Sequence, residues 1–304
     1  MRLGYACINT ALAETGVQVN RSMIRRTFTE RGISYASELA QANVADLEAI
    51  IDWNITNSLL LYRMSSDMFP WMSEYELGDL PDYDRISEIL ARVGLKVRQH
   101  DLRLTFHPGP FNVLASPDSN VVSRTIKELR QHAEIMDLIG LPKSPFSKIN
   151  IHLGGAYGDR RSAIERFIDH FYQLPPSVRD RLTVENDDRA NMFSVGDLIA
   201  VHDATGTPIV FDYHHHSFRS GDLTVREALE LALSTWPRAV RPVVHVSSSR
   251  KLYEDQAASA ASHADFIYEP FTSWGNEVDV MLEAKAKEAA ALRFRTSMQA
   301  ANFR

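Results

Sequence analysis

Short apolar runs alternate with segments of helical spacing along the whole chain. The eight apolar runs, which we interpret as strands, are Leu3–Ile8, Ser58–Tyr62, Leu102–Phe106, Ile149–Leu153, Leu182–Val184, Pro208–Phe211, Val243–Val246 and Val278–Leu282. The predicted helices, in which apolar residues recur every three to four positions, are Asn43–Asn57, Asp82–Val93, Asn120–Ile139, Ser162–Tyr172, Ser194–His202, Thr224–Leu233 and Ala284–Ala300. Strands that alternate with helices are typical of βαβ units in a parallel sheet.

The number of strand–helix units points to a barrel. Eight units in 304 residues match the size of a (β/α)₈ TIM barrel. The rival is a doubly wound open sheet, which usually carries a glycine-rich phosphate turn after its first strand, but here C-I-N-T follows. Ser194 and Thr224 are placed to cap helices, and Gly140 followed by Pro142 ends one. We therefore predict the α/β class, as a single TIM-barrel domain over residues 1–304.

Six consecutive predicted strands each deliver a metal-competent side chain at or near the carboxyl end. These residues are His107, His152, Glu185, Asp212, His245 and Glu283. In a TIM barrel the carboxyl ends of the strands meet on one face, where active sites lie. Buried carboxylates need a compensating charge, and no lysine or arginine closes any of these six runs. Divalent cations would compensate, and mixed nitrogen and oxygen ligands suit Zn²⁺, Mn²⁺ or iron. The sequence therefore predicts a metal centre.

Other histidines are less informative on their own. Asp212 opens the stretch D-Y-H-H-H, whose spacing alone leaves open which of His214, His215 and His216 faces the centre. His263 lies in the loop between the last two runs, from which it could reach the same face. The histidines that we interpret as structural, inside helical patterns or before a turn, are His100, His132, His170 and His202.

Each of four residues near the first two runs can be interpreted in two ways. Tyr5 and Asn9 flank the end of the first run and could face the site, although a strand tyrosine more often packs in the core. Arg63 and Glu74 belong to the stretch after the second run, which is either a phosphate-binding loop or an ordinary capped loop.

Composition limits the class of partner. The formal net charge is -6, whereas a protein that holds DNA by bulk charge would be basic. Any nucleic acid must therefore be bound by a local patch or by metal ions. The single cysteine, Cys7, allows no internal disulfide, and no run approaches the length of a membrane span. We expect a soluble, cytoplasmic protein.

The chain resembles the UV damage endonucleases, which are relatives of the endonuclease IV group of nucleases. The motifs that carry the resemblance are G-Y-A-C at 4–7, R-M-S-S-D at 63–67, P-W-M-S at 70–73, H-P-G at 107–109, S-P-D at 116–118, H-L-G-G-A-Y-G at 152–158, V-E-N-D-D-R at 184–189, D-Y-H-H-H at 212–216, R-P-V-V-H at 241–245 and D-V-M-L-E-A-K-A-K-E at 279–288. The resemblance implies a TIM barrel with up to three divalent ions, most often Mn²⁺, with Zn²⁺, Co²⁺ or Mg²⁺ as alternatives. It implies incision of double-stranded DNA immediately 5′ to UV photoproducts, with 3′-hydroxyl and 5′-phosphate ends. It implies no obligate protein partner, and action at the nucleoid.

The resemblance also implies roles for individual residues, with the six strand-end residues as the catalytic set. His107, His152 and Glu185 resemble the ligands of one ion, and Glu185 bridges to a second ion held by Asp212, His245 and Glu283. The family spacing D-x-x-H selects His215, which with His263 would hold a third ion; Glu74 and His216 are further candidates. The implied DNA and lesion contacts are Tyr5, Asn9, Arg63, Pro110, Phe111 and Lys285.

The chain departs from the family pattern at three places. Pro110 and Phe111 stand where a Gln-Tyr pair follows H-P-G, Val243 stands where some members carry a modified lysine, and Glu74 replaces a histidine. Two other functions stay open. A sugar isomerase or epimerase barrel uses a similar set of Glu, Asp, His and Glu, and a non-catalytic DNA-damage binder could keep the scaffold.

Overall fold

The protein is a closed barrel of parallel strands. The structure, a computed structural model, describes residues 1–302. Its eight strands follow the order β3-β2-β1-β8-β7-β6-β5-β4, and all neighbours pair in parallel. A parallel bridge between Phe106 and Ile149 joins the two ends of this order. The strands are β1 Leu3–Ala6, β2 Leu61–Arg63, β3 Arg103–Thr105, β4 Ile149–His152, β5 Leu182–Glu185, β6 Ile209–Asp212, β7 Val243–Val246 and β8 Asp279–Leu282. The predicted TIM barrel is confirmed.

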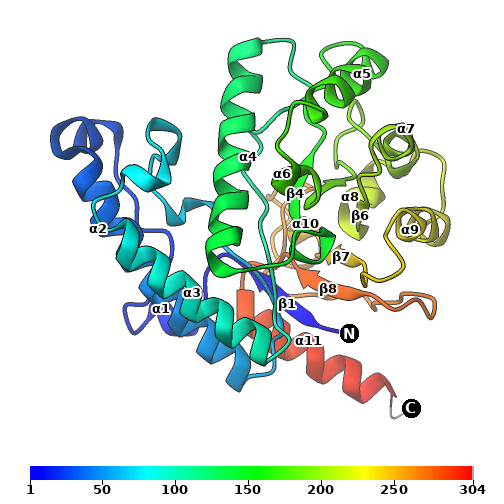
Figure 1. The fold of residues 1–304 in the computed structure, drawn as a ribbon. Coiled ribbons are helices and arrows are strands. Elements are labelled where there is room, and N and C mark those ends of the chain that lie inside the picture. Colours follow the sequence, from blue (N-terminus) through cyan, green and yellow to red (C-terminus); the bar gives the residue numbers. More distant parts are fainter. Residues whose placement is uncertain (303–304) are drawn as a thin grey trace.

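Helices lie outside the strands and between them in sequence (Figure 1). They are α1 Thr10–Ala13, α2 Arg25–Thr56, α3 Tyr83–Gln99, α4 Ser119–Ile139, α5 Arg160–Phe171, α6 Pro176–Arg179, α7 Val195–Thr205, α8 Tyr213–Phe218, α9 Val225–Ser234, α10 Arg250–Tyr253 and α11 Lys287–Asn302, with short 3₁₀ turns η1 Ser66–Met68, η2 Met72–Glu74, η3 Leu77–Asp79 and η4 Pro145–Ser147. Ser194 and Thr224 cap α7 and α9 through capping boxes, and Gly140 ends α4 with a left-handed φ of 76°. Among residues 1–302, no helix combines the length and apolar character that a membrane crossing needs.

One helix is much longer than its sequence pattern indicates. Helix α2 begins at Arg25, far before the predicted start, and its helical geometry is broken at Gly32, where φ is 66°. Between this break and the predicted start at Asn43, the face that it buries is built from small residues, Ala36, Ser37 and Ala40. A search for large apolar residues at helical spacing misses such a face, because small residues give little contrast with their polar neighbours.

The amino end of the barrel is sealed by a buried ion pair. Arg103 and Asp279, the first residues of β3 and β8, are both fully buried. Arg103 Nη1 donates to Asp279 Oδ2 at 3.1 Å and to the Arg241 carbonyl at 2.7 Å. Arg2 pairs with the same carboxylate oxygen at 3.1 Å. Burial lowers the pKa of Arg103 to about 10, so it keeps its charge near neutral pH. The ion pair therefore closes the interior of the barrel at this end.

Candidate metal centre

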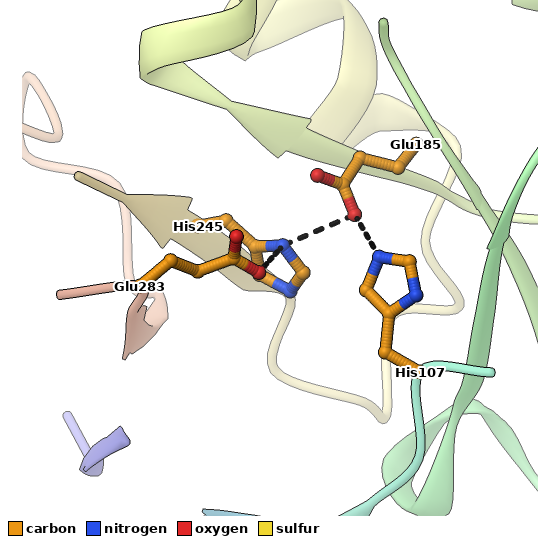
Figure 2. A group of neighbouring side chains, drawn as sticks. All are labelled: His107, Glu185, His245 and Glu283. Carbon is orange, nitrogen blue, oxygen red and sulfur yellow. Dashed lines mark hydrogen bonds and ion pairs between the residues drawn. The ribbon is translucent and has the colours of Figure 1, made fainter. Parts of the chain in front are cut away.

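Glu185 lies at the middle of a cluster of histidines and carboxylates at the carboxyl end of the barrel (Figure 2). It ends β5, and its side chain is fully buried. Its Oε2 lies 3.1 Å from His107 Nε2 and 3.1 Å from His245 Nδ1. Its Oε1 lies 3.3 Å from His215 Nδ1. One carboxylate therefore contacts side chains from three other parts of the barrel.

Two groups of donor atoms meet at this carboxylate. In the first, donor atoms of His107, Glu185, His245 and Glu283 lie within 4.8 Å of one another, and in the second the same holds for His152, Glu185 and His215. Glu185 belongs to both groups, so the two groups share one carboxylate. The grouping differs from the expected one: His107 lies with His245 and Glu283, while His152 lies with His215. The grouping depends on the direction in which each side chain points, and the position of a residue along its strand does not reveal that direction.

Asp212 and His263 lie at the edge of the cluster. Asp212 Oδ1 accepts a hydrogen bond of 2.7 Å from the His215 backbone, which caps α8, and lies 4.0 Å from His215 Nδ1. His263 Nδ1 lies 3.8 Å from Glu283 Oε2. Both are outside the two tight groups of donor atoms, although each lies next to one of their members.

The cluster contains buried nitrogen and oxygen atoms that have no hydrogen-bond partner in the protein. Within residues 1–302, Glu185 Oε1, Asp212 Oδ2, His152 Nδ1 and His245 Nδ1 are buried without a hydrogen bond of acceptable geometry. Leaving such atoms unpaired is costly, and native proteins rarely do so. Carboxylate oxygens and imidazole nitrogens are also the donors that Zn²⁺ and Mn²⁺ accept. The residues present therefore fit divalent ions, although the geometry does not select which metal.

Two basic side chains reach the same cluster, which corrects one premise of the sequence argument. Arg63, at the end of β2, forms an ion pair with Glu283 and is only 13% exposed. Lys148, immediately before β4, is fully buried, and its Nζ lies 3.2 Å from His245 Nε2. Burial lowers the pKa of Lys148 to about 7. Arg63 thus compensates the carboxylates in part without an ion. Arg63 lies inside the cluster rather than on an open DNA-facing surface.

Sequence reasoning missed three polar residues of the centre. Lys148 and Asn150 share the inward face of β4 with His152, because alternate strand residues point to the same side. Asn150 donates to Glu185, and Thr183 donates to Asn150 at 2.7 Å. Asp187, two residues after Glu185, has its Oδ1 3.2 Å from His152 Nδ1. Counting back by two from His152, and forward by two from Glu185, would have found all three.

The ion-free centre keeps Glu185 ionised. Burial alone would raise the pKa of Glu185, but the charges of His245 and His152, with the close approach of His107 and His215, outweigh it and hold the pKa well below its usual range. Burial lowers the pKa of His107 to about 4 despite its contact with Glu185. His152 and His215 differ, because nearby carboxylates overcome their burial and raise their pKa values to about 9 and about 11.

Mn²⁺ binding should release protons. At neutral pH the raised pKa values leave His152 and His215 protonated in the ion-free protein. A metal ion needs the free lone pair of a ring nitrogen, so binding at these residues displaces protons. Lowering the pH strengthens proton competition, and affinity should fall. Calorimetry in buffers of different ionisation enthalpy measures the released protons; a binding enthalpy independent of buffer would contradict this.

The three histidines after Asp212 point in different directions. His215 Nδ1 lies 3.0 Å from the Asn186 carbonyl and next to Glu185. His214 Nε2 lies 3.3 Å from the Ala261 carbonyl, and its ring packs on His263. His216 is buried with its ring 5.3 Å from that of Phe211. Only His215 of the three belongs to a group of candidate ligands.

This geometry predicts different effects for two neighbouring substitutions. His215→Ala removes a member of the second ligand group and should weaken Mn²⁺ binding by about 10-fold or more, in line with the loss of a ligand-sphere residue. His214→Ala removes a ring outside that group and should change the affinity far less. Titration of each variant with Mn²⁺, with free ion followed by electron paramagnetic resonance, gives both affinities. If His214→Ala loses the ion and His215→Ala keeps it, the assignment of His215 is wrong.

The expected DNA contacts fall into exposed and buried residues. Pro110 and Phe111 form the tip of the loop between β3 and α4, and Phe111 is 88% exposed. Lys285 is also exposed, just after Glu283. Tyr5 is fully buried instead: its hydroxyl donates to Asn54 at 2.7 Å and accepts from Asn9 at 2.9 Å. Asn9 is itself buried as the N-cap of α1. These two residues lie within the packing, so a DNA contact would require them to move.

The remaining candidates lie apart from the two groups of donor atoms. Glu74 is exposed on η2. Val243 is buried in β7 and brings no ligand atom. Beside the centre, a cavity of about 290 Å³ is lined by the 108–113 loop, by Gly154 and Gly155, by the 187–192 segment, and by His152 and His215. The mouth of the barrel thus combines the donor cluster, a cavity and an exposed aromatic tip.

Comparisons with known proteins show the family of this chain. The family model described as UV-endonuclease UvdE matches residues 1–303. The chain belongs to the UV-endonuclease UvdE family. It is 31% identical to the UV DNA damage endonuclease of Bacillus cereus (strain G9842), with 96% of this chain and 93% of the relative covered. It is 32% identical to the UV DNA damage endonuclease of Bacillus velezensis (strain DSM 23117 / BGSC 10A6 / LMG 26770 / FZB42), over 84% of this chain and 80% of that protein.

Solved structures place this UvdE family member among related barrels. The crystal structure of SacUVDE superimposes with a TM-score of 0.87 at 31% identity, over 99% of each chain. Endonuclease IV from Thermus thermophilus gives a TM-score of 0.56 at 12% identity, over 97% of this chain and 99% of that one. D-psicose 3-epimerase from Clostridium cellulolyticum H10 gives 0.53 at 11% identity, over 79% and 80%. The last two likenesses concern the fold alone.

Proposed function

We propose that the protein is a metal-dependent DNA repair endonuclease that cuts double-stranded DNA immediately 5′ to UV photoproducts, leaving a 3′-hydroxyl and a 5′-phosphate. The observation that carries this is the pair of ligand groups sharing Glu185, at the mouth of a barrel of the UvdE family. Up to three divalent ions, most often Mn²⁺, complete the centre. Because its substrate is DNA, the protein would act in the cytoplasm, at the nucleoid. It would need no obligate protein partner.

The residues of the centre divide the work of hydrolysis between them. Divalent ions bound here would activate a water molecule, polarise the phosphate and stabilise the leaving oxygen. Glu185 holds the two ligand groups together through both of its oxygens. Asp187 Oδ1 lies 3.2 Å from His152 Nδ1 and adds negative charge beside that ring. Arg63, paired with Glu283, adds fixed positive charge inside the centre. The charge match to DNA is therefore local, despite the net charge of -6.

Lesion recognition is assigned to the loop between β3 and α4. Its exposed tip residues, Pro110 and Phe111, offer apolar surface of the kind that wedges between base steps. A photoproduct already distorts the stack, so extruding it costs less than extruding normal bases. The cavity beside His152 and His215 lies next to this loop and is open to receive the extruded bases. Exposed Lys285 is placed to contact a backbone phosphate.

Removing the aromatic ring at the tip should weaken damage binding. Phe111→Ala is expected to lower affinity for a duplex with one photoproduct by about 5- to 100-fold, because one stacked ring contributes about 1–3 kcal/mol. Its affinity for single-stranded DNA should change much less. Leu95→Ala, which truncates an exposed apolar side chain on α3, is the control. Fluorescence anisotropy measures both affinities, and equal losses for duplex and single strand would count against a wedge.

A sugar epimerase is the alternative that the fold leaves open. Epimerase barrels share this architecture, and a single ligand set of Glu185, Asp212, His245 and Glu283 would serve such an enzyme. The second group, with His152 and His215 around the shared Glu185, favours the nuclease because a site with one ligand set has no need for it. The same groups disfavour a non-catalytic binder, because a protein that only binds DNA does not need buried ion ligands.

The test uses EDTA-treated protein and supercoiled plasmid. We expect UV-irradiated plasmid to be nicked when Mn²⁺ is restored, with unirradiated plasmid left intact in the same tube series. Folded protein that nicks neither plasmid with Mn²⁺, Mg²⁺, Co²⁺ or Zn²⁺ would refute the proposed function. Release of epimerised sugar from a ketose panel under the same conditions would support the alternative.

A further inference from the structure

Lys148 has an environment that is unusual for a lysine. It precedes β4 directly, and its side chain is fully buried inside the barrel. Lysine is almost never fully buried unless it is paired, because its amine must leave water. Within residues 1–302, the only side chain that its Nζ contacts by a hydrogen bond or ion pair is His245, through Nε2 at 3.2 Å. The lysine is therefore held against one imidazole nitrogen rather than against a carboxylate.

The other nitrogen of that imidazole faces the donor cluster. His245 Nδ1 lies 3.1 Å from Glu185 Oε2 and 3.1 Å from Glu283 Oε1, and it has no hydrogen bond of acceptable geometry within the described chain. Figure 2 shows this nitrogen turned toward both carboxylates. The two nitrogens of one ring thus meet two different surroundings: a lysine amine on one side, and candidate ligand oxygens on the other.

We propose that Lys148 is a positioning residue of the metal centre, which fixes the His245 ring so that Nδ1, and not Nε2, is offered to the ion. A histidine ring can flip about its Cβ–Cγ bond, and the hydrogen bond made by one nitrogen decides which nitrogen binds metal. A flip of the His245 ring would break its contact with Lys148 and place a carbon atom against the buried amine. The inference rests on the proposed function, since it gives the lysine a role toward the same ions.

The first test needs no substitution. Wild-type protein, labelled with ¹⁵N in its histidine rings and loaded with Zn²⁺ in place of Mn²⁺, is studied by NMR without DNA. We expect the His245 signals to show metal on Nδ1, and a slowly exchanging proton on Nε2 that is donated to the Lys148 amine. Metal on Nε2 of His245 would overturn the proposal whether or not any variant folds.

The second test compares two buried substitutions. Lys148→Met keeps most of the side-chain length and removes the amine, and it should weaken Mn²⁺ binding by about 10- to 100-fold, the usual cost of losing a partner of a ligand histidine. Val243→Ala, on β7 beside His245, opens a small cavity without removing a polar contact and should bind Mn²⁺ within about twofold of wild type. The NMR proton at His245 Nε2 should become fast-exchanging only in Lys148→Met. Wild-type affinity and an unchanged Nε2 proton in Lys148→Met would overturn the proposal.

These measurements separate the inference from the proposed function, because neither uses DNA. Ion binding with the predicted His245 geometry, in a protein that does not nick irradiated DNA, would support the role of Lys148 and refute the nuclease. Nicking by wild type, together with Mn²⁺ binding that is insensitive to Lys148→Met, would do the reverse. A wild-type protein that binds no divalent ion would overturn both.

Discussion

Replacing Glu185 with glutamine should abolish incision of UV-damaged DNA while the barrel stays folded. Glu185 is the one residue common to both groups of donor atoms, and its two oxygens face three histidines. Glutamine keeps the shape but removes the charge and turns an N–H₂ group toward positions that need a lone pair. We expect the initial nicking rate to fall by at least about 1,000-fold, which corresponds to roughly 4 kcal/mol of transition-state stabilisation.

The matched control is a second buried carboxylate of the same barrel. Asp279→Asn neutralises a carboxylate that is as deeply buried as Glu185 but lies at the opposite, closed end. At a temperature where both variants are folded by circular dichroism, Asp279→Asn should nick irradiated DNA at close to the wild-type rate. Nicking by Glu185→Gln at a comparable rate would remove Glu185 from the bridging position.

Asp279→Asn should instead produce the largest loss of stability. Its carboxylate compensates Arg103, which is also fully buried, and it pairs with Arg2. Removing one partner of a buried pair leaves an uncompensated charge, so we expect the free energy of unfolding to fall by about 3–5 kcal/mol. Urea unfolding followed by circular dichroism measures the change.

An exposed ion pair supplies the comparison for that experiment. Glu30 pairs with Arg26 one helical turn away, and both side chains are more than half exposed. Glu30→Gln should therefore cost less than about 1 kcal/mol. A loss of similar size in Glu30→Gln and Asp279→Asn would contradict the view that the buried pair seals the barrel.

The barrel was predictable because buried parallel strands are apolar on both faces and appear in the sequence as continuous runs. All eight predicted runs overlap the observed strands, and the largest offset is at Ser58–Tyr62, which begins before β2 starts at Leu61. Helix boundaries were predicted correctly where a cap was visible, as at Ser194. The start of α2 was missed, because small residues form the buried face of its first half.

The position of the site was predictable from topology alone, since strand ends in a TIM barrel converge. Its internal arrangement was not. Strand order does not say that His107 lies with Glu283, because this depends on how each side chain turns after the strand ends. The two basic side chains of the cluster were also hidden: Lys148 precedes its strand, and Arg63 resembled a loop residue. Both enter the cluster because an inward-facing strand position admits a long side chain as readily as a short one.

The most direct test of the account is end mapping on a duplex that carries a single photoproduct, labelled at both ends of the damaged strand. With Mn²⁺, the protein should cut one phosphodiester, immediately 5′ to the lesion. The fragments should carry a 3′-hydroxyl that a polymerase extends and a 5′-phosphate that a ligase joins. Cutting at other positions, equal cutting of the undamaged duplex, or fragments with the opposite end groups would contradict it.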